Sequence, residues 1–416
     1  MINEASRTTP VAASFDVIVA GGGPAGFAAA ISAARTGAKV LLIEVHGALG
    51  GVWTCGLLTY VLDAGGKRGG VMAELVRRLE AAEGRPLTTD RAHDLPWVTG
   101  SWFFNPETMR FVLETWCVEC GIEILYHTRV AAAATHERRV THVITEGPGG
   151  RQAWAGHAFV DATGNGDLGA LAGCPFRMGR DGAGGQVQPL SLLALVGGVA
   201  QDAIAPFIHG APGSGGEDSR RLLTALRQAG VEPSYGHPIL LPAAPGIWSL
   251  MAGHQYGVRC DDARALSRAT IAGRAEVHAQ ITALRRLGGP WSGLHVVATA
   301  AQIGIREGRR LEGRYTVTAD DLIRGARFDD AVCRVTFPVD IHALDPRHGT
   351  GYGNDGVKAK PYDIPLRALI SAAHDNLAFA GRCISGDFVA HASYRVTGNA
   401  VPMGEAAGGW AASLRG

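Results

Sequence analysis

Three observations predict an α/β protein built from two domains. An apolar run at residues 15–20, a glycine-rich turn, an alanine-rich segment and a second apolar run at 39–43 form one strand–helix–strand unit of about thirty residues. The chain has 416 residues, which is too long for one ordinary domain and comfortable for two. Between residues 181 and 216 glycine and proline become frequent, which is typical of the passage into an inserted domain.

The first part of the chain alternates strand and helix patterns. The runs at 15–20 and 39–43 are short and apolar, as buried parallel strands are, and Pro24–Arg35 has the small residues of a tightly packed helix. Asn105 is placed to cap a helix over 106–120, which has a proline in its first turn. We also expect a helix at 71–82, strands at 122–126, 130–134 and 158–162, and a hairpin that turns at 147–150.

The second part is expected to hold the insert and the end of the first domain. Thr318 and Asp321 have the spacing of a capping box. Helices are expected at 219–228, 261–287 and 396–414, and strands at 238–241, 247–251 and 377–380. We therefore expect a first domain formed by residues 1–180 and 292–416, with an α+β substrate domain inserted at 181–291.

Composition excludes several kinds of partner. The formal net charge is +1 and no basic run alternates with aromatic residues, so no nucleic acid is expected. The first dozen residues lack the pattern of a signal peptide, and the longest apolar stretch, 189–200, is too short and too glycine-broken to span a membrane. The seven cysteines are expected to be reduced thiols of a cytoplasmic protein.

The motif with the most specific chemistry follows the first strand. It has the spacing G-x-G-x-x-G and contains Gly21, Gly23, Pro24, Ala25 and Gly26. Gly21 allows a tight turn, Gly23 lets backbone N–H groups approach a pyrophosphate, and Gly26 lets the helix pack against the strand. Glu44 ends the second strand, where it is placed to accept hydrogen bonds from ribose hydroxyls and would repel a 2′-phosphate. The unit therefore predicts a Rossmann-like domain whose helix N-terminus faces the phosphates of a dinucleotide.

The glycine loop alone fits either FAD or NAD, and later segments resemble a family of flavoproteins. The run Asp-Ala-Thr-Gly at 161–164 resembles a strand end of two-dinucleotide-binding-domain flavoproteins, and 376–385 resembles their C-terminal strand that meets the ribityl chain. With Gly50, Gly51 and the runs 302–306 and 364–367, these segments are similar to the FAD-dependent oxidoreductase family often found beside xanthan-lyase-like proteins. The resemblance covers nearly the whole chain except about 181–250, and it implies a glutathione-reductase-like fold with FAD as the cofactor.

The resemblance also points to residues beside the flavin. Thr163 and Gly164 lie in the first run, and Gly381 and Arg382 end the C-terminal strand. Many flavoproteins carry Gly-Asp at that point, and here the Gly-Asp pair comes only at 386–387. Strand spacing favours Gly381 and Arg382, although the other pair stays open.

Two further regions join the candidate cofactor site. Val130 starts the strand expected at 130–134. Thr397, Gly398 and Asn399 begin the last helix, where their N–H groups are placed to stabilise the negative charge of reduced flavin at N1 and the C2 carbonyl. The alternative for this segment is an ordinary C-terminal helix packed on the core.

Catalytic candidates come from chain order around the flavin. His391 and Arg395 fall between the C-terminal strand and the last helix, where His391 is placed to accept a proton and Arg395 to bind a substrate oxygen or negative charge. A solvated loop histidine is the equal alternative for His391. Arg306 from a basic cluster and His254 from the insert complete the set, although such residues are commonly exposed or packed without a catalytic role. For His342 a core role is favoured.

Other motifs are set aside. A second G-x-G-x-x-G at 164–169 lacks an acidic strand end at the right distance, so it is interpreted as a flavin-side turn. Cys55 has no cysteine nearby for a redox-active pair. Cys117 and Cys120 have C-x-x-C spacing without a second pair of ligands, so no metal site is expected.

These patterns favour an FAD-dependent oxidoreductase that takes hydride from a small organic substrate, of which a hydroxylated or sugar-like compound is one example. Because no separate NAD(P)H domain is found, electrons are expected to pass to dioxygen or an electron carrier. Two alternatives stay open: a flavin-dependent monooxygenase or halogenase, and a flavoprotein subunit of a larger complex, against which the absence of iron–sulfur cysteine clusters counts. The sequence leaves the substrate, the covalency of the flavin and the oligomeric state open, with a homo-oligomer as one expectation.

Overall fold

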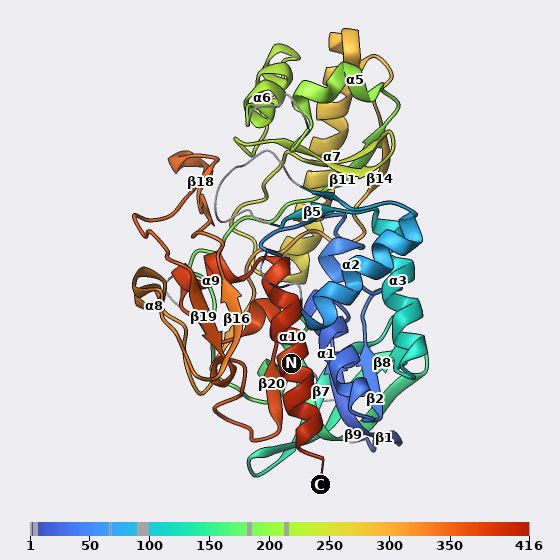
Figure 1. The fold of residues 1–416 in the computed structure, drawn as a ribbon, viewed down its shortest axis with the longest axis vertical. Coiled ribbons are helices and arrows are strands. Elements are labelled where there is room, and N and C mark those ends of the chain that lie inside the picture. Colours follow the sequence, from blue (N-terminus) through green and yellow to red (C-terminus); the bar gives the residue numbers. More distant parts are fainter. Residues whose placement is uncertain are drawn as a thin grey trace.

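The chain folds into two larger sheets with helices packed around each (Figure 1). The structure, a computed structural model, describes residues 7–65, 69–89, 100–180, 185–211 and 216–415, together with residues 2 and 67. Parts of the glycine-rich stretch expected at 181–216 lie outside the described residues. In Figure 1 the larger sheet lies in the lower half, and the green and yellow elements of the insert lie at the top.

The larger sheet has seven strands in the order β6-β2-β1-β9-β8-β7, with β20 also paired to β9. The pairs β6–β2, β2–β1, β1–β9 and β9–β20 are parallel, whereas β7, β8 and β9 form an antiparallel meander. The strands are β1 Val11–Ala20, β2 Val40–Ile43, β6 Glu123–Leu125, β7 Arg129–His136, β8 Arg139–Gly147, β9 Gly150–Asp161 and β20 Leu377–Phe379. The helices around it are α1 Pro24–Arg35, α2 Gly70–Glu83, α3 Pro106–Glu119 and α10 Thr397–Ser413.

The carboxyl ends of four parallel strands meet at one edge of this sheet. Ala20 pairs with Ile43 and with Asp161, and Asp161 pairs in turn with Phe379. Each strand is followed at this edge by a motif that the sequence singled out. These motifs are the glycine loop at 21–26, Glu44, the turn at 162–164 and the pair at 381–382. Residues far apart in the chain therefore converge where α/β sheets bind their ligands.

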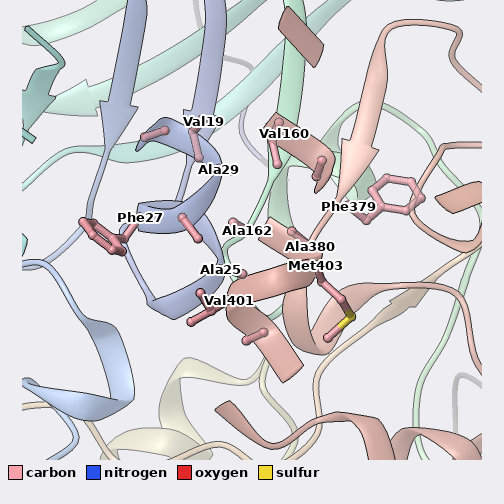
Figure 2. Close-up of a cluster of buried hydrophobic side chains, with 14 of the residues drawn as sticks. Val19, Ala25, Phe27, Ala29, Val160, Ala162, Phe379, Ala380, Val401 and Met403 are labelled. Carbon is pink, nitrogen blue, oxygen red and sulfur yellow. The ribbon is translucent and has the colours of Figure 1, made fainter. Parts of the chain in front are cut away.

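Helices α1 and α10 pack with their backbones in close contact. A Cβ at Gly404 would lie 2.0 Å from the carbonyl oxygen of Ala25, and one at Gly408 would lie 2.1 Å from that of Ala29. Figure 2 shows Ala25 and Ala29 within the apolar core that these helices share with the strands. Because only glycine leaves room for this approach, α10 packs directly against α1, the helix that follows the glycine loop.

The insert is organised by a four-stranded antiparallel sheet. Its order is β12 Ile239–Ala244, β13 Ile247–Met251, β11 Ala194–Gly197 and β14 His295–Thr299. Helices α5 Gln201–Ile204, α6 Asp218–Gln228 and α7 Ala263–Leu287 pack against it, with Leu226, Trp248 and Leu284 in the shared core. The expected insert boundary at residue 291 is too early for this sheet, because β14 pairs with β11 and completes it.

The remaining elements are short strands and helices outside the two larger sheets. Strand β16 Ala331–Val335 pairs with β19 Tyr362–Pro365, and β17 Ile341–His342 pairs with β18 Tyr352–Gly353. The short elements are β3 Tyr60–Val61, β4 Thr88–Thr89, β5 Trp102–Phe103, β10 Phe176–Arg177, β15 Arg310–Leu311, α4 Asp167–Leu171, α8 Ala319–Arg324 and α9 Phe388–Tyr394, with 3₁₀ helices at Gly51–Trp53, Ala205–Phe207, Gly289–Trp291, Pro346–His348, Leu366–Ala368 and Gly381–Cys383.

Most sequence predictions of elements are confirmed. Asn105 caps α3 by accepting from the Glu107 N–H, and Thr318 and Asp321 form the capping box of α8. The loop expected around His391 is wrong, because Asp387 accepts from the Ala390 N–H and starts helix α9 there. No helix in the described part of the chain is both long and apolar enough to cross a lipid bilayer.

Candidate active site

A cavity of about 610 Å³ lies along the carboxyl edge of the larger sheet. Its walls combine segments from the start, the middle and the end of the chain. They include Gly21, Gly23, Pro24, Ala25, Glu44, Gly51, Val130, Thr163, Gly164, Gly381, Arg382, Arg395 and Thr397. Helix α7 of the insert also contributes Ala263, Leu266 and Thr270. The cavity is therefore closed on one side by the insert.

The three motif glycines of the loop, Gly21, Gly23 and Gly26, differ in their surroundings. Gly21 has φ +97°, a left-handed value that glycine tolerates, and it makes the turn out of β1. A Cβ at Gly26 would lie 1.7 Å from the carbonyl oxygen of Gly21, so helix and loop touch at this point. A Cβ at Gly23 would meet no atom within 4 Å, because this position faces the open cavity. Gly50 does not line the cavity but donates its N–H to the Gly22 carbonyl at 2.8 Å.

Glu44 lies at the cavity wall in a fixed orientation. Its carboxylate accepts a hydrogen bond from the Gly22 N–H at 2.7 Å and another from the His46 N–H at 2.8 Å. The residue is 5% exposed. Each carboxylate oxygen retains acceptor capacity beyond its one backbone bond, so the side chain can still accept from a ligand hydroxyl.

The turn after β9 is fixed by a buried carboxylate. Asp161 accepts from the N–H and hydroxyl of Thr163 and from the N–H of Gly169. Burial raises the pKa of Asp161 to about 6 despite these hydrogen bonds. The bonds shape the backbone at Thr163 and Gly164, which line the cavity, and helix α4 begins within the 164–169 motif, at Asp167.

The pair at 381–382 lies at the cavity, and the alternative Gly-Asp pair does not. Gly381 and Arg382 line it, whereas Asp387 is used to cap α9 and to accept from the Ala319 N–H at 2.7 Å. Arg382 donates to the side-chain oxygen of Asn165 at 3.0 Å, and its Nε has no partner among the described residues. Arg382 is therefore a half-buried cation at the cavity wall, and its buried Nε is an unused donor.

The start of α10 differs from the sequence prediction. Thr397 lines the cavity, but the N–H of Gly398 donates to the Leu62 carbonyl at 3.0 Å and the N–H of Asn399 donates to Val396 at 3.1 Å. A Cβ at Gly398 would lie 2.1 Å from that Leu62 oxygen, so the 57–65 loop packs directly on the helix end. The expectation that the Gly398 and Asn399 N–H groups face the flavin is wrong, because protein acceptors already occupy them.

Beyond Arg395 the structure assembles a buried group that we call the insert-side polar cluster: Arg306, Asp340, His342, His254 and Arg395. Arg395 donates to the Asp340 carboxylate at 2.9 Å and to its carbonyl at 3.0 Å. The same carboxylate lies 3.2 Å from Nε2 of His342. The rings of His254 and His342 have centroids 4.9 Å apart. The cluster therefore joins the insert to the cofactor domain next to a cavity-lining arginine.

Hydrogen bonding fixes the tautomers of both cluster histidines. The Tyr256 hydroxyl donates its proton to the Ser234 carbonyl at 2.9 Å, so its oxygen can only accept from Nδ1 of His254, 3.3 Å away. Nε2 of His254 then carries a lone pair. His342 bonds to Asp340 through Nε2–H, which leaves a lone pair on Nδ1. These two buried nitrogens, Nε2 of His254 and Nδ1 of His342, have no partner among the described residues.

Burial keeps both rings neutral. It lowers the pKa of His342 to about 4, with the nearby Arg306 guanidinium acting in the same direction. Burial also lowers the pKa of His254, and Arg306 again adds to the effect. Neutral imidazoles with free lone pairs can accept a hydrogen bond from a hydroxyl, although burial and the Arg306 guanidinium disfavour lasting protonation of the rings.

His391 has a different environment. It is fully buried within α9, neither ring nitrogen has a partner among the described residues, and it is absent from the cavity walls. Burial lowers its pKa well below the usual value, and Arg310 and Arg395 add to this. The alternative of a solvated loop histidine is wrong, and the residue lies behind Arg382 and Arg395 rather than at the cavity surface.

Sequence reasoning missed part of the site. Asp340 carries no motif of its own and lies just before β17, so its approach to His342 had no sequence signal. The effect of Tyr256 on His254 depends on Ser234, which no sequence pattern identifies. The α7 residues at the cavity had no signal, because they come from the amphipathic start of a long helix.

Comparisons with known proteins identify the family of the chain. The family model described as FAD dependent oxidoreductase matches residues 16–415. A dihydrolipoyl dehydrogenase of Trypanosoma brucei brucei is 51% identical over 49 residues, which are 12% of this chain and 10% of that protein. The match thus spans about a tenth of that curated relative.

Solved structures align at low identity. A geranylgeranyl bacteriochlorophyll reductase-like protein of Thermoplasma acidophilum aligns at TM-score 0.48 and 13% identity, covering 96% of this chain and 77% of the other. A p-nitrophenol 4-monooxygenase of Pseudomonas putida aligns at 0.42 and 13%, covering 73% and 70%. A myxobacterial chondrochloren halogenase aligns at 0.45 and 14%, covering 91% and 71%.

The residues of the cavity fit FAD. The open space at Gly23 suits a pyrophosphate close to the backbone, and the unused Nε donor of Arg382 suits an anionic or hydroxylated portion of the cofactor. The carboxylate of Glu44 suits ribose hydroxyls. The family match and this chemistry agree on FAD as the cofactor.

Proposed function

We propose that this chain, which belongs to the FAD-dependent oxidoreductase family over residues 16–415, oxidises a small hydroxylated organic substrate at the insert-side polar cluster. FAD supplies the hydride acceptor for such a reaction. Among oxidases, dehydrogenases and monooxygenases, we favour an oxidase or dehydrogenase that draws electrons from its organic substrate and passes them to dioxygen or an electron carrier.

The cofactor is held, in this proposal, by the two walls of the cavity. Gly21, Gly23 and Glu44 bind the ADP half, with Val130 beside it, because they surround the open space after β1 and β2. The ribityl and flavin portions lie toward the other end of the cavity. The residues proposed there are Pro24, Ala25, Gly51, Thr163, Gly164, Gly381, Arg382 and Thr397.

One observation carries the proposed chemistry: the free lone pair on Nε2 of His254. A secondary alcohol loses hydride from carbon and a proton from oxygen, and the proton needs an acceptor within hydrogen-bond reach. His254 is neutral, oriented by Tyr256 and free of any protein partner at Nε2. The proton passes to this nitrogen, while Arg395 and Arg306 bind substrate oxygens.

His391 is retained as the second candidate for the proton acceptor. Its two ring nitrogens are free, but the side chain is fully buried and stands behind Arg382 and Arg395. A substrate would reach it only after these arginines moved. His254 is also buried and outside the cavity walls, but Tyr256 orients its ring and it belongs to the same cluster as the cavity-lining Arg395, so His254 is favoured.

The cell compartment is part of the same proposal. All seven cysteines are free thiols, and Cys120 alone among them is partly exposed. Burial raises the pKa of the others, which favours the neutral thiol. This usage supports the reducing cytoplasm.

The test begins with the absorption spectrum of the purified protein. The FAD-loaded protein is then mixed anaerobically with a panel of alcohols and hydroxy acids, and in parallel with NADH and NADPH. Bleaching of the flavin band by an organic substrate alone supports the proposal. Rapid bleaching by NAD(P)H with none by the organic panel would overturn it in favour of a monooxygenase or halogenase.

A further inference from the structure

Arg306 is a buried cation without a carboxylate partner. Its guanidinium donates to the Pro189 carbonyl at 2.8 Å and to the Ser191 hydroxyl at 2.9 Å, and it contacts the Met251 sulfur at 3.7 Å. Over the described residues no carboxylate oxygen comes within 4.0 Å of it. Burial lowers the pKa of Arg306 to about 10, so it stays charged at neutral pH. A buried charge is costly unless an anion neutralises it.

The charges around Arg306 leave one positive charge uncompensated. Arg395 is paired with Asp340, and the two cluster histidines are neutral near pH 7. Two guanidinium groups against one carboxylate give the cluster a net charge of +1. One bound carboxylate, with a charge of −1, would neutralise the cluster. A phosphate dianion would leave it with a net negative charge.

Neighbouring carboxylates are occupied elsewhere. Glu307 pairs with Arg310 and accepts the N–H groups of Gly179 and Gln188. Glu276 accepts from the N–H and hydroxyl of Ser234 and from other side chains of the insert. Neither carboxylate is free to turn toward Arg306.

Hydrogen-bonding groups without a partner lie around this cation, and they include both acceptors and a donor. Nε2 of His254 and Nδ1 of His342 are acceptors, so each requires a donor such as a hydroxyl. The side-chain NH₂ of Gln188 is a buried donor without an acceptor, and the Gln188 oxygen accepts the His342 N–H at 3.1 Å. The group therefore offers donors for an anion and acceptors for hydroxyls.

We propose that the insert-side polar cluster binds the carboxylate of a small hydroxy acid at Arg306, with its hydroxyl directed to the free ring nitrogens of His254 and His342. This inference rests on the proposed function and narrows its substrate from hydroxylated compounds to hydroxy acids. The oxidation then converts the carbinol into a carbonyl. Bound FAD would supply the hydride acceptor for the carbinol carbon, His254 would accept the hydroxyl proton, and the carboxylate would be unchanged, so the product would be a keto acid.

Binding tests this inference without turnover. FAD-loaded protein is titrated with D-lactate, L-lactate and D-gluconate, and with the uncharged counterparts 1,2-propanediol and D-glucitol. Perturbation of the flavin absorption band and the shift of the unfolding temperature report binding. At least one acid is expected to bind about 10- to 100-fold more tightly than its uncharged counterpart, because charge-assisted hydrogen bonds to the guanidinium are lost with the carboxylate.

Two variants assign the effect to Arg306. Arg306→Gln removes the charge and is expected to abolish the preference for the acid, while Arg306→Lys retains part of it. Arg314→Gln, at an exposed arginine that pairs with Asp375, serves as the matched control and keeps the preference. If Arg306→Gln does not fold, Arg306→Lys tests the assignment, and an unchanged preference for the acid in that variant would count against Arg306.

The outcomes separate this inference from the proposed function. Acids that bind through Arg306 but never bleach the flavin support the site and count against the oxidation. Bleaching by polyols with equal or weaker binding of the acids overturns the carboxylate site and leaves the oxidation intact. Absence of saturable binding by every acid also overturns it.

Discussion

The carboxylate of Glu44 accepts a hydrogen bond from the backbone N–H of Gly22 at 2.7 Å, so the end of β2 and the glycine loop are bound to each other. A second bond from the His46 N–H holds the other oxygen at 2.8 Å. Because both oxygens are anchored, the side chain is oriented toward the cavity before a ligand arrives. This geometry reduces the ordering cost of binding a ribose at Glu44.

Replacing Glu44 by alanine is expected to weaken FAD binding by about 10- to 100-fold, since charge-assisted hydrogen bonds contribute about 1.5–3 kcal/mol. The substitution also releases the Gly22 N–H and loosens the loop. Fluorescence titration of the apoprotein with FAD measures the effect. Glu123→Ala, at an exposed strand residue, is the control. Unchanged affinity in Glu44→Ala would show that this carboxylate only braces the loop.

Alanine substitutions at two glycines of the same loop are expected to have different effects, one on stability and one on FAD affinity. Gly26→Ala would place a Cβ 1.7 Å from the Gly21 carbonyl oxygen, so α1 must shift and the free energy of unfolding should fall by about 1–3 kcal/mol or more. Gly23→Ala meets no atom within 4 Å and has an ordinary φ of −69°. It should leave the unfolding temperature of the apoprotein unchanged while reducing FAD affinity. Equal loss of stability in both variants would contradict this division of roles.

The strand–loop–helix unit could be predicted because its signals are local. The bounds of α1 follow from Pro24 at its first turn and the glycine that follows Thr36, and the apolar strands on either side can only be buried. The positions of Glu44, Thr163 and Gly381 at one edge follow from parallel strands ending together.

The polar cluster could not be predicted, because it depends on pairings across the chain. Asp340 and Arg395 are 55 residues apart in sequence, and Arg306 reaches the cluster from a segment that pairs with the insert. The hydrogen bond from the Gly398 N–H to the Leu62 carbonyl could not be predicted either, because Leu62 lies in a loop that no sequence pattern identifies. Chain order placed His391 between the right elements but did not show that Asp387 starts a helix that turns it into the core.

The burial of His391 is expected to make the free energy of unfolding depend on pH. Its folded-state pKa is lowered well below 6.5 by burial, with Arg310, Arg395 and Arg382 adding to the effect, so the unfolded chain takes up a proton that the folded state refuses. Its contribution is fully present above about pH 6.5 and is lost as the pH falls below that value, at about 1.4 kcal/mol per pH unit.

Replacing His391 by leucine should therefore reduce the acid sensitivity of unfolding by about one proton. Denaturant unfolding of wild type and His391→Leu at pH 7, 6 and 5 gives the two slopes. Val401→Ala, at a buried apolar residue of α10, controls for core destabilisation without removing a titrating group. Parallel pH profiles for wild type and His391→Leu would contradict the buried neutral histidine.

The last prediction separates the two candidate proton acceptors. A positioned base is worth about 10²–10⁴-fold in rate, so His254→Ala should slow anaerobic reduction of the flavin by that factor while FAD stays bound. Tyr256→Phe removes the hydroxyl that accepts from Nδ1 of His254, and it should slow reduction by a smaller factor because the ring loses its preferred tautomer. His391→Leu should reduce at close to the wild-type rate. The measurement is a stopped-flow reductive half-reaction with whichever compound bleaches the flavin. If His391→Leu is slow and His254→Ala is fast, the proton acceptor is His391, and Arg382 and Arg395 must move to admit the substrate.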